Sequence, residues 1–314
     1  MAFAGAMAVA MIIDALLGWP NSLFVRIGHP VTWMGRLIEV LDAGWNRMAD
    51  ASLKRRASGV AAALIVIVLA GGTGWLLQNS IPSSGWRGTL IAGILAWPFV
   101  ALRSLYEHVA AVARALQSGD IVAARSAVSR IVGRDPTKLD EAAIARAAIE
   151  SLAENTSDGV VAPAIWGALL GLPGIMGYKA INTLDSMIGH RTERHETFGW
   201  AAARIDDVAN FVPARITGLL FAVLGQRPKS AFACMLSDAP RHRSINAGWP
   251  EAAMAGALSV RLCGPRFYHG ELADEPWLNG SVRDPDTSDV AFALRLYARA
   301  MTCLAGLLAV LAFI

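Results

Sequence analysis

The sequence predicts an all-α, polytopic integral membrane protein in which re-entrant or broken helices line a polar site. Its 314 residues are 54% hydrophobic and only 17% charged, and the mean hydropathy is +0.43. Soluble domains usually carry about 25% charged residues, so the deficit indicates a membrane environment. Ten Trp against four Tyr favour the same conclusion, because indole rings are stable at the lipid headgroup boundary. We expect one membrane domain over residues 1–314.

The basic and cysteine residues argue against two other classes of protein. The net charge is only +3 and the 28 Lys and Arg residues are scattered, so we expect no nucleic-acid partner. Cys234, Cys263 and Cys303 are odd in number and lack the spacing of metal ligands. We therefore expect three reduced packing residues, with neither a disulfide framework nor a zinc site.

Four apolar segments are candidate membrane spans, because each supplies most of the roughly 20 apolar residues that cross a hydrocarbon core. They are residues 3–19, 57–77, 88–105 and 298–314. No Lys or Arg precedes the first segment, and the first basic residue is Arg26. A retained membrane helix is therefore favoured there over a cleaved secretory signal.

Two weaker apolar segments are predicted to be re-entrant or cavity-lining helices. The first, residues 159–181, contains a Gly-Leu-Pro-Gly break, and the second, residues 208–224, carries Pro213 and Arg215 inside the run. Broken helices and charged side chains at membrane depth occur mainly where they line a polar cavity.

The distribution of Lys and Arg predicts the orientation. Loop 20–56 holds six of them, loop 78–87 holds one, and loop 106–158 holds six. The positive-inside rule therefore places the first and third of these loops in the cytoplasm. The side on which residues 182–207 lie stays open, because it depends on whether the two weaker segments cross the membrane.

Polar residues of the middle third repeat at helical spacing. Residues 138–156 show the periodicity of a helix. Two polar faces follow from the four-residue spacing, with Arg146, Glu150 and Glu154 on one face and Ser151, Asn155 and Asp158 on the other. A solvated face with an Arg–Glu pair is one explanation. We favour a functional site, because the helix leads into a membrane-depth segment where carboxylates are costly.

The segment YKAINTLDSM, residues 178–187, holds a second polar group. Lys179, Asn182 and Ser186 share one helix face, and Asp185 lies one turn from Asn182. These groups suit a phosphate and a hydrated cation, since Mg²⁺ binds one or two carboxylates plus water and phosphate oxygens. The alternative is a helix cap at a membrane boundary, although a cap needs only one such residue.

The segment ARIDDVANFVPAR, residues 203–215, holds a third group. Asp206 and Asp207 precede Asn210 by one helical turn, so the three side chains converge on one surface. Adjacent carboxylates repel unless a cation lies between them. Mg²⁺ is one candidate for that cation, and ion pairs with Arg204 and Arg215 are the alternative.

Two weaker signals lie nearer the N-terminus. Arg134 and Lys138 precede a predicted helix for which Thr137 is a candidate N-cap, and this arrangement favours anion binding. His29, just before a proline, is more typical of a structural role. The sequence contains no phosphate-loop or dinucleotide-binding fingerprint, so an ATP site would have to be a non-standard helical one.

Three motifs of the central region, AENTSDG, NTLDSM and ARIDDVANFVPAR, are specific enough to identify a family. Together they resemble the adenosylcobinamide-phosphate synthase family, CobD/CbiB. HPVTWMGRLI near the start, and NAGWPEAAMAGAL followed by FYHGEL near the end, match its other landmarks in the same order. The resemblance covers nearly the whole chain, and the divergent parts are the apolar spans and the 274–290 loop.

The resemblance implies an ATP-dependent ligase of cobalamin biosynthesis. Such an enzyme joins a carboxylate of adenosylcobyric acid to aminopropanol or its O-phosphate, giving adenosylcobinamide or its phosphate. We expect ATP and Mg²⁺ as cofactors, with phosphoryl transfer to the carboxylate before the amine attacks. We expect a multi-pass protein of the inner (plasma) membrane with a cytoplasmic active face. Its partners would be these substrates, membrane lipid and other membrane enzymes of late cobalamin assembly.

The polar groups then receive expected roles. We expect catalysis, including the base that takes the amine proton, from Glu150, Glu154 and Asp158. We expect the substrate and phosphate contacts from Arg134, Lys138, Asn155, Lys179, Asn182, Ser186, Arg204 and Arg215. We expect the metal ligands to be Asp185, Asp206, Asp207 and Asn210.

Two alternatives from other functional classes stay open. A corrinoid transporter or a non-catalytic membrane scaffold would explain the membrane residence, but it would not need paired acidic clusters. A Mg²⁺-dependent intramembrane prenyltransferase would use acidic motifs between helices, although the spacing of such motifs differs from the one here.

Overall fold

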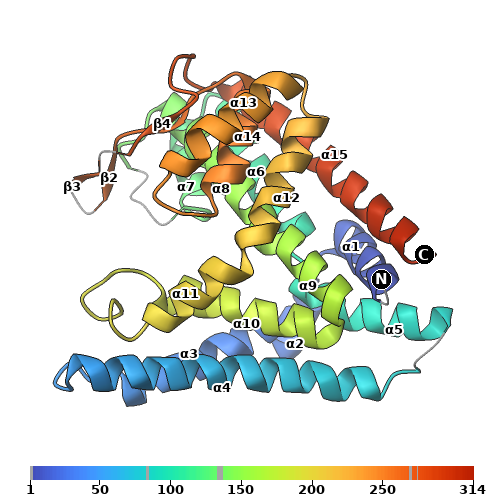
Figure 1. Ribbon diagram of the computed structural model, residues 1–314. Coiled ribbons are helices and arrows are strands. Elements are labelled where there is room, and N and C mark those ends of the chain that lie inside the picture. The colour runs from blue at the N-terminus through green and yellow to red at the C-terminus, as the bar shows by residue number, and fades with distance from the viewer. Residues whose placement is uncertain (1–2, 83–84, 133–136, 269–270, 274) are drawn as a thin grey trace. The chain divides into compact units, whose positions relative to one another are not determined.

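The computed structural model describes residues 3–82, 85–132, 137–268, 271–273 and 275–314. The described residues are overwhelmingly helical, which confirms the predicted fold class (Figure 1). They form two compact units that interleave along the sequence. Unit 1 comprises Met1–Ala101, Ala162–Asn210 and Ala305–Ile314, and unit 2 comprises Leu102–Val161 and Phe211–Leu304.

The elements of unit 1 are helical. They are α1 (Ala4–Leu17), α2 (Asn21–Ile27), α3 (Pro30–Trp45), α4 (Ser52–Asn79), α5 (Trp86–Ala96), the 3₁₀ turn η1 (Trp97–Phe99), α9 (Ala162–Leu170), α10 (Leu172–Ile188) and α11 (Trp200–Ala209). The end of α15 (Thr287–Leu311) also belongs to this unit.

Unit 2 adds two short hairpins to its helices. Its elements are α6 (Leu102–Gln117), α7 (Ile121–Val128), α8 (Glu141–Thr156), the π-helical turn η2 (Ser157–Val161), α12 (Phe211–Leu224), α13 (Pro228–Asp238), the 3₁₀ turn η3 (Ala239–Arg241), α14 (Gly248–Leu258) and most of α15. The strands pair antiparallel, β1 (Leu262–Cys263) with β4 (Trp277–Leu278) and β2 (Arg266–Tyr268) with β3 (Glu271–Ala273).

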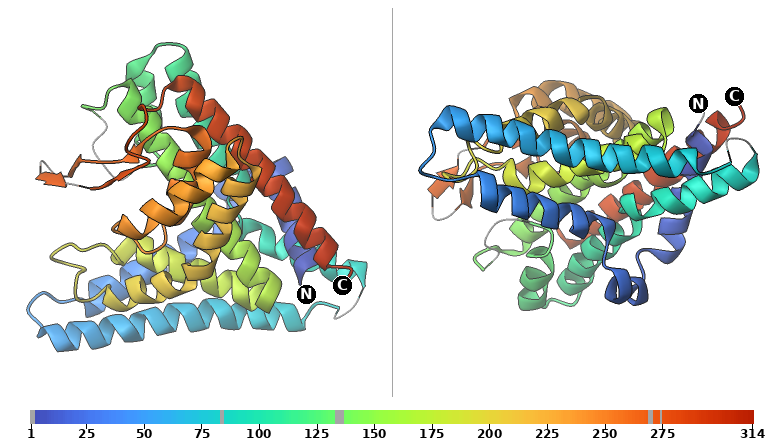
Figure 2. Two further views of the ribbon diagram at one scale, coloured as in Figure 1. Left: turned by 45° about the horizontal axis from the view of Figure 1, so that its top comes forward. Right: turned by 90° about the horizontal axis from the view of Figure 1, so that it is seen from below.

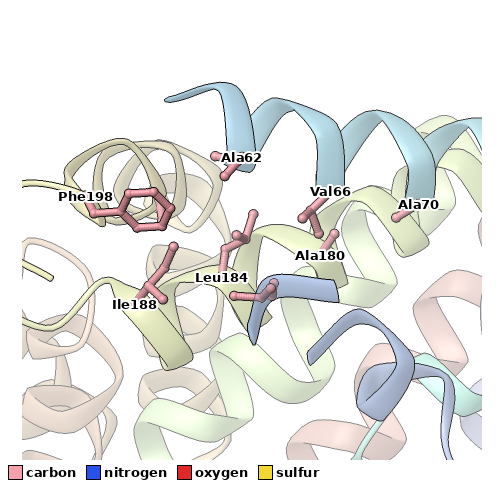
Figure 3. Packing of buried hydrophobic residues seen from close by; sticks show 10 residues of the cluster. Ala62, Val66, Ala70, Ala180, Leu184, Ile188 and Phe198 are labelled. Carbon is pink, nitrogen blue, oxygen red and sulfur yellow. The ribbon is translucent and has the colours of Figure 1, made fainter. Parts of the chain in front are cut away.

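The core of unit 1 lies between α4 and α10, which pack along each other with α3 and α11 beside them (Figure 1). The view from below shows α3 next to α4 (Figure 2). Small and branched side chains alternate along the contact, where Ala62, Val66 and Ala70 meet Ala180 and Leu184 (Figure 3). Small residues let helices approach closely, and close packing is the main force between helices in lipid.

Two glycines let α4 touch backbone at the start of α10 and at Phe198, just before α11. A Cβ atom at Gly74 would lie 2.6 Å from the carbonyl oxygen of Leu172, and one at Gly59 would lie 1.9 Å from the carbonyl oxygen of Phe198. Both distances are far below van der Waals contact, so any larger residue would push the segments apart. The position of α10, which carries a predicted site, therefore depends on these two glycines.

Among the described residues, three helices are long and apolar enough to cross a membrane, or up to five if each bent pair counts as one span. The three are Ser52–Asn79, Trp86–Gln117 and Thr287–Leu311, and they contain the predicted spans 57–77, 88–105 and most of 298–314. Only 28% of the apolar window of α4 is buried. Its exposed Leu64, Val68 and Leu69 therefore form a surface suited to lipid.

The first predicted span is shorter than expected. Instead of residues 3–19, α1 ends at Leu17, because Gly18 adopts a positive φ of 59° and Pro20 follows. It passes the length and composition test only together with Asn21–Trp45, at a bend of 106°.

Both weaker segments contain a helix break, and neither break falls at a proline. In 159–181 the break falls at Gly171, which has φ +71° and separates α9 from α10. In 208–224 the bend of 46° falls at Asn210 rather than at Pro213. Pro213 lies in the first turn of α12, where a missing N–H costs little.

Candidate functional site

The acidic motif of α11 is fixed to α10 by a chain of buried hydrogen bonds. Tyr178 of α10 donates its hydroxyl to Oδ1 of Asn210 at 2.8 Å, and Nδ2 of Asn210 donates to Oδ2 of Asp206 at 3.0 Å. Trp166 donates its indole N–H to the carbonyl oxygen of Ala209 at 3.1 Å. Asn210 is only 1% exposed. The carboxylate of Asp206 is therefore held in one orientation.

A second carboxylate of α11 lies near one from α10. Asp207 is partly exposed and accepts a hydrogen bond from Arg204 at 3.0 Å, as expected for an i,i+3 ion pair. Burial raises the pKa of Asp185, and the negative charge of Asp207 raises it further, while His190 opposes the shift. The charge of Asp207 therefore acts on Asp185 of the other helix, whereas the sequence spacing predicts repulsion between Asp206 and Asp207.

The other polar residues of α10 bond along their own helix. Lys179 donates to Oδ1 of Asn182 at 3.3 Å, and Ser186 donates its hydroxyl to the carbonyl oxygen of Asn182 at 2.8 Å. The structure therefore brings Lys179, Asn182 and Ser186 onto one surface. We refer to these residues, with Asp185 of the same helix and the acidic residues of α11, as the α10–α11 group of unit 1.

The residues predicted to share one face of α8, in unit 2, differ in their exposure. Glu150 is 6% exposed and accepts a hydrogen bond from the backbone N–H of Cys263 at 2.7 Å. Glu154, one turn later, is exposed. Arg146 forms its ion pair with Asp284 and stacks on Trp277 at 4.7 Å from the ring centroid. The face is therefore neither uniformly solvated nor a single cavity lining.

The end of α8 carries an irregularity that the spacing does not reveal. Asn155 is exposed and bonds back to Ser151, with its Nδ2 2.8 Å from the carbonyl oxygen. Asp158 follows in the π-helical turn η2, and such turns are frequent at functional sites. Within the described residues, the buried hydroxyl of Ser157 has no hydrogen-bond partner.

The remaining basic candidates have separate surroundings. Arg134 lies outside the described residues. Lys138 is exposed before α8, whose N-cap is Asp140 rather than Thr137, because Asp140 Oδ1 accepts from Ala143 N–H at 2.8 Å. Arg215 stacks between the rings of Phe211 and Trp249, at 3.5 and 4.5 Å from their centroids, and donates to the carbonyl oxygen of Phe211.

The α10–α11 group contains the donor types that Mg²⁺ uses. Hard oxygen ligands from carboxylates and an amide suit Mg²⁺ and Ca²⁺, whereas softer metals favour nitrogen and sulfur. The mutual repulsion of Asp185 and Asp207 would be relieved by a bound cation. The ammonium of Lys179 and the guanidinium of Arg204 would at the same time suit phosphate oxygens.

Comparison with known proteins assigns the family. The family model described as "CobD/Cbib protein" matches residues 7–297. The chain belongs to the CobD/CbiB family. It is 60% identical to the cobalamin biosynthesis protein CobD of Rhodobacter capsulatus, with 99% of each chain covered. It is 47% identical to that of Sinorhizobium fredii, covering 97% of this chain and 95% of the relative, and 43% identical to that of Brucella suis, covering 96% and 94%.

No solved structure matches the chain. The family match confirms the resemblance predicted from the motifs and supports a role in cobalamin biosynthesis. The motifs AENTSDG, NTLDSM and ARIDDVANFVPAR all fall inside the matched range. In this CobD/CbiB chain they lie on α8 and η2, on α10, and on α11 and α12 respectively.

One buried network of this CobD/CbiB chain escaped the sequence reasoning. The segment between α10 and α11 is tied down by Arg194, which donates to Asp42 Oδ2 at 2.6 Å. Arg55, 7% exposed, donates to Asn46 Oδ1 at 2.9 Å and also to the carbonyl oxygen of Arg194. Arg55 is the middle one of three consecutive basic residues at the start of α4, which is an ordinary membrane-flanking signal, so no local pattern distinguishes it as buried.

Proposed function

We propose that the chain is an ATP-dependent amide ligase of cobalamin biosynthesis. It would join a carboxylate of adenosylcobyric acid to the amine of aminopropanol or of its O-phosphate, with ATP converted to ADP and phosphate. The observation that carries the proposal is the α10–α11 group, in which the charge of Asp207 contributes to the raised pKa of Asp185 and the same two helices carry Lys179, Asn182 and Arg204. Membership of the CobD/CbiB family supplies the substrate class.

Mg²⁺ bound with ATP would neutralise charge that develops on the transferred phosphoryl group. In our proposal Asp185, Asp206 and Asp207 hold that cation, and Asn210 keeps Asp206 oriented through the hydrogen bond described above. Lys179 and Arg204 bind phosphate oxygens. Phosphoryl transfer needs mainly positioning and charge neutralisation, which fixed carboxylates and cations can provide.

The attacking amine must lose a proton, so a carboxylate base is needed. Glu150 is the less suitable candidate, because its Oε1 already accepts the N–H of Cys263. Glu154 is exposed, and in our proposal it is the base. Asp158, in the π-helical turn that follows, is proposed to contact the same substrate.

The deciding experiment is ATP hydrolysis by the purified protein in lipid nanodiscs. We expect hydrolysis only when adenosylcobyric acid and an aminopropanol substrate are both present, with one ADP formed for each amide bond. ATP hydrolysis stimulated by the corrinoid alone, without amide formation, would favour the transporter. No ATP hydrolysis under any substrate combination would overturn the ligase.

The metal role is tested by Asp207→Asn, which keeps the side-chain size and removes the charge. We expect the Mg²⁺ concentration for half-maximal rate to rise at least ~10-fold, the scale seen for groups that support a metal. Asp50→Asn is the matched control, because it breaks another ion pair of unit 1, with Lys54 at 2.8 Å. Equal Mg²⁺ requirements in the two variants would show that Asp207 does not bind the metal.

A further inference from the structure

A second group of ligand-type side chains lies in unit 2, apart from every residue assigned to the ligase reaction. His242 follows the 3₁₀ turn η3, Glu251 lies in the first turn of α14, and Cys263 ends strand β1. The three belong to separate elements that pack against one another. Their ligand atoms, an imidazole nitrogen, a carboxylate oxygen and a thiol sulfur, all lie within 4.8 Å of one another.

The distances within this cluster are close to those of a tetrahedral ion. The Sγ atom of Cys263 is 3.0 Å from Oε2 of Glu251, and Nε2 of His242 is 3.7 Å from the same oxygen. Zinc bonds of about 2.0 Å to nitrogen or oxygen and about 2.3 Å to sulfur place tetrahedral ligands about 3.3–3.6 Å apart. The two separations from Glu251 differ from these values by about 0.5 Å or less, while the imidazole and thiol, which lie within 4.8 Å of each other, would have to draw together around the ion.

The cluster is buried, as a site for a tightly held ion requires. The side chains of His242 and Glu251 are 7% and 5% exposed, and Cys263 is 2% exposed. A carboxylate is costly to bury unless its charge is compensated. A divalent cation provides that compensation for a carboxylate and a thiolate together.

The surroundings hold each ligand in place. The Nδ1 atom of His242 accepts a hydrogen bond from the backbone N–H of Ser244 at 3.0 Å and lies 3.2 Å from the carbonyl oxygen of the same residue. These contacts hold the ring on its own turn, and its Nε2 faces Glu251. A Cβ atom at Gly248 would lie 2.5 Å from Cβ of His242, so only glycine leaves the imidazole where it is.

The backbone at Cys263 is also held in a defined conformation. Glu150 accepts the N–H of Cys263 at 2.7 Å. Cys263 has φ +58°, a left-handed conformation that non-glycine residues rarely adopt. Such conformations persist where the surrounding structure enforces them, often at ligand sites. The consequence is that a sulfur atom points at Glu251 from a turn that favours glycine.

We propose that His242, Glu251 and Cys263 bind one zinc ion, or another divalent metal that accepts sulfur, at a site separate from the Mg²⁺ of the ligase. The donor set decides the class of metal, because thiolate and imidazole favour zinc over Mg²⁺. Binding displaces the thiol proton of Cys263 to solvent, so the ion meets a thiolate, a carboxylate and a neutral imidazole. Three protein ligands leave one tetrahedral position for water.

The first test is the metal content of wild-type protein, purified without chelators and measured by mass spectrometry. We expect about one zinc per chain, and about one Co²⁺ after exchange, with a thiolate-to-cobalt charge-transfer band in the near ultraviolet. Protein that binds no zinc after incubation with an equimolar amount, as judged by competition with a chelating dye, would show that the cluster is only a hydrogen-bonded network. That outcome overturns the proposal whatever the variants do.

The second test separates the cluster from cysteine in general. Cys263→Ser should lose the charge-transfer band and lower zinc affinity at least tenfold. Cys234→Ser is the matched control, because Cys234 is also a buried cysteine of unit 2 bonded to a carboxylate, with Sγ 3.5 Å from Asp238. If Cys263→Ser fails to fold, Glu251→Gln tests the same site without touching the thiol. Unchanged zinc affinity in a folded Cys263→Ser or Glu251→Gln variant would show that the substituted side chain does not bind the metal.

Discussion

In unit 2, the carboxylate of Asp284 is held by two arginine side chains. Asp284 accepts hydrogen bonds from Arg261, at 2.9 Å from its Nε, and forms an ion pair with Arg146. Both guanidinium groups also stack on Trp277, at 4.7 and 4.3 Å from the ring centroid. The charge of Asp284 therefore helps to hold two arginines and one indole ring together.

This arrangement predicts a pH dependence of stability. The hydrogen bond from Arg261 and the charge of Arg146 lower the pKa of Asp284. A carboxyl group with a depressed pKa in the folded state stabilises the fold above its unfolded pKa of about 3.9 and loses that effect as the pH falls through the folded value. Asp284→Asn should therefore lower the thermal midpoint near neutral pH, and the gap to wild type should close below about pH 4.

Differential scanning fluorimetry of detergent-solubilised protein between pH 7 and pH 3 measures this gap. Asp50→Asn is again a useful control, because its ion pair with Lys54 is more exposed and belongs to unit 1. A gap that stays constant over the whole pH range would mean that Asp284 acts through packing and not through its charge.

The polar residues illustrate which local chemistry a sequence can predict. The i,i+3 pairing of Arg204 with Asp207 and the i,i+4 bond of Asn210 to Asp206 follow from helical spacing alone. The partners of Arg146 and Glu150 do not, because Asp284 and Cys263 lie far away in the chain. Cys263 is free and buried, in line with the reduced packing role predicted from the cysteine spacing. Its neighbours His242 and Glu251 come from other elements, so spacing along the chain does not reveal them.

At the scale of single elements, the α10–α11 group depends on the helix break just before α10. Gly171 begins α10 with φ +71°, and Gln78 of α4 accepts the N–H of Leu172 at 2.8 Å. A Cβ atom at Gly171 would lie 1.9 Å from that same Oε1 atom of Gln78. The break is thus capped by a side chain from the helix against which α10 packs.

Gly171→Ala should destabilise the protein by about 1–3 kcal/mol, because alanine is strained at positive φ and its methyl group displaces Gln78. Gly177→Ala is the matched control, since Gly177 lies within α10 and a Cβ atom there would meet nothing within 4 Å. That control should be neutral or stabilising by up to about 1 kcal/mol. Chemical denaturation in mild detergent compares the two, and similar losses in both would mean that Gly171 is not a special position.

Element boundaries were predictable where glycine or proline dictates the backbone. The Gly-Leu-Pro-Gly break in 159–181 is an example, because Gly171 adopts the positive φ expected of that residue. The bend at Asn210 was not predictable. At the break, Asn210 accepts a hydrogen bond from Tyr178 of another helix, a contact that hydropathy and propensity do not encode.

At the scale of the whole molecule, the positive-inside rule predicts the side of loops 20–56 and 106–158 but does not decide the side of residues 182–207. We expect residues 189–199, which connect α10 to α11, to lie on the cytoplasmic side, where ATP is available. Asp42, Asn46 and Arg55 bind this segment through Arg194, and they belong to the loop 20–56 that is rich in Lys and Arg. The whole connection should therefore share that loop's side of the membrane.

Labelling of a cysteine placed at the exposed Glu193 measures this sidedness. Glu193→Cys, combined with Cys303→Ser to remove the exposed native thiol, should resist an impermeant maleimide in intact cells and react in inverted vesicles. Cys303→Ser alone gives the background. Labelling in intact cells would place the α10–α11 group on the face away from ATP, and the ligase proposal would then need another nucleotide site.

The interleaving of the two units has a consequence for the order of events during synthesis. Helix α4 leaves the ribosome well before α10, the helix that covers its small residues. Until then Ala62 and Val66 face lipid or a neighbouring protein. A photo-crosslinking residue at Ala62 should therefore cross-link to lipid or to another protein in chains truncated after residue 161 and lose those products in chains that reach residue 210. The same products in both would mean that α10 does not cover this position of α4. If the expected difference is found, the nascent chain holds an unfinished core through the synthesis of much of unit 2, so that interval is when it most needs an insertase or a chaperone beside it.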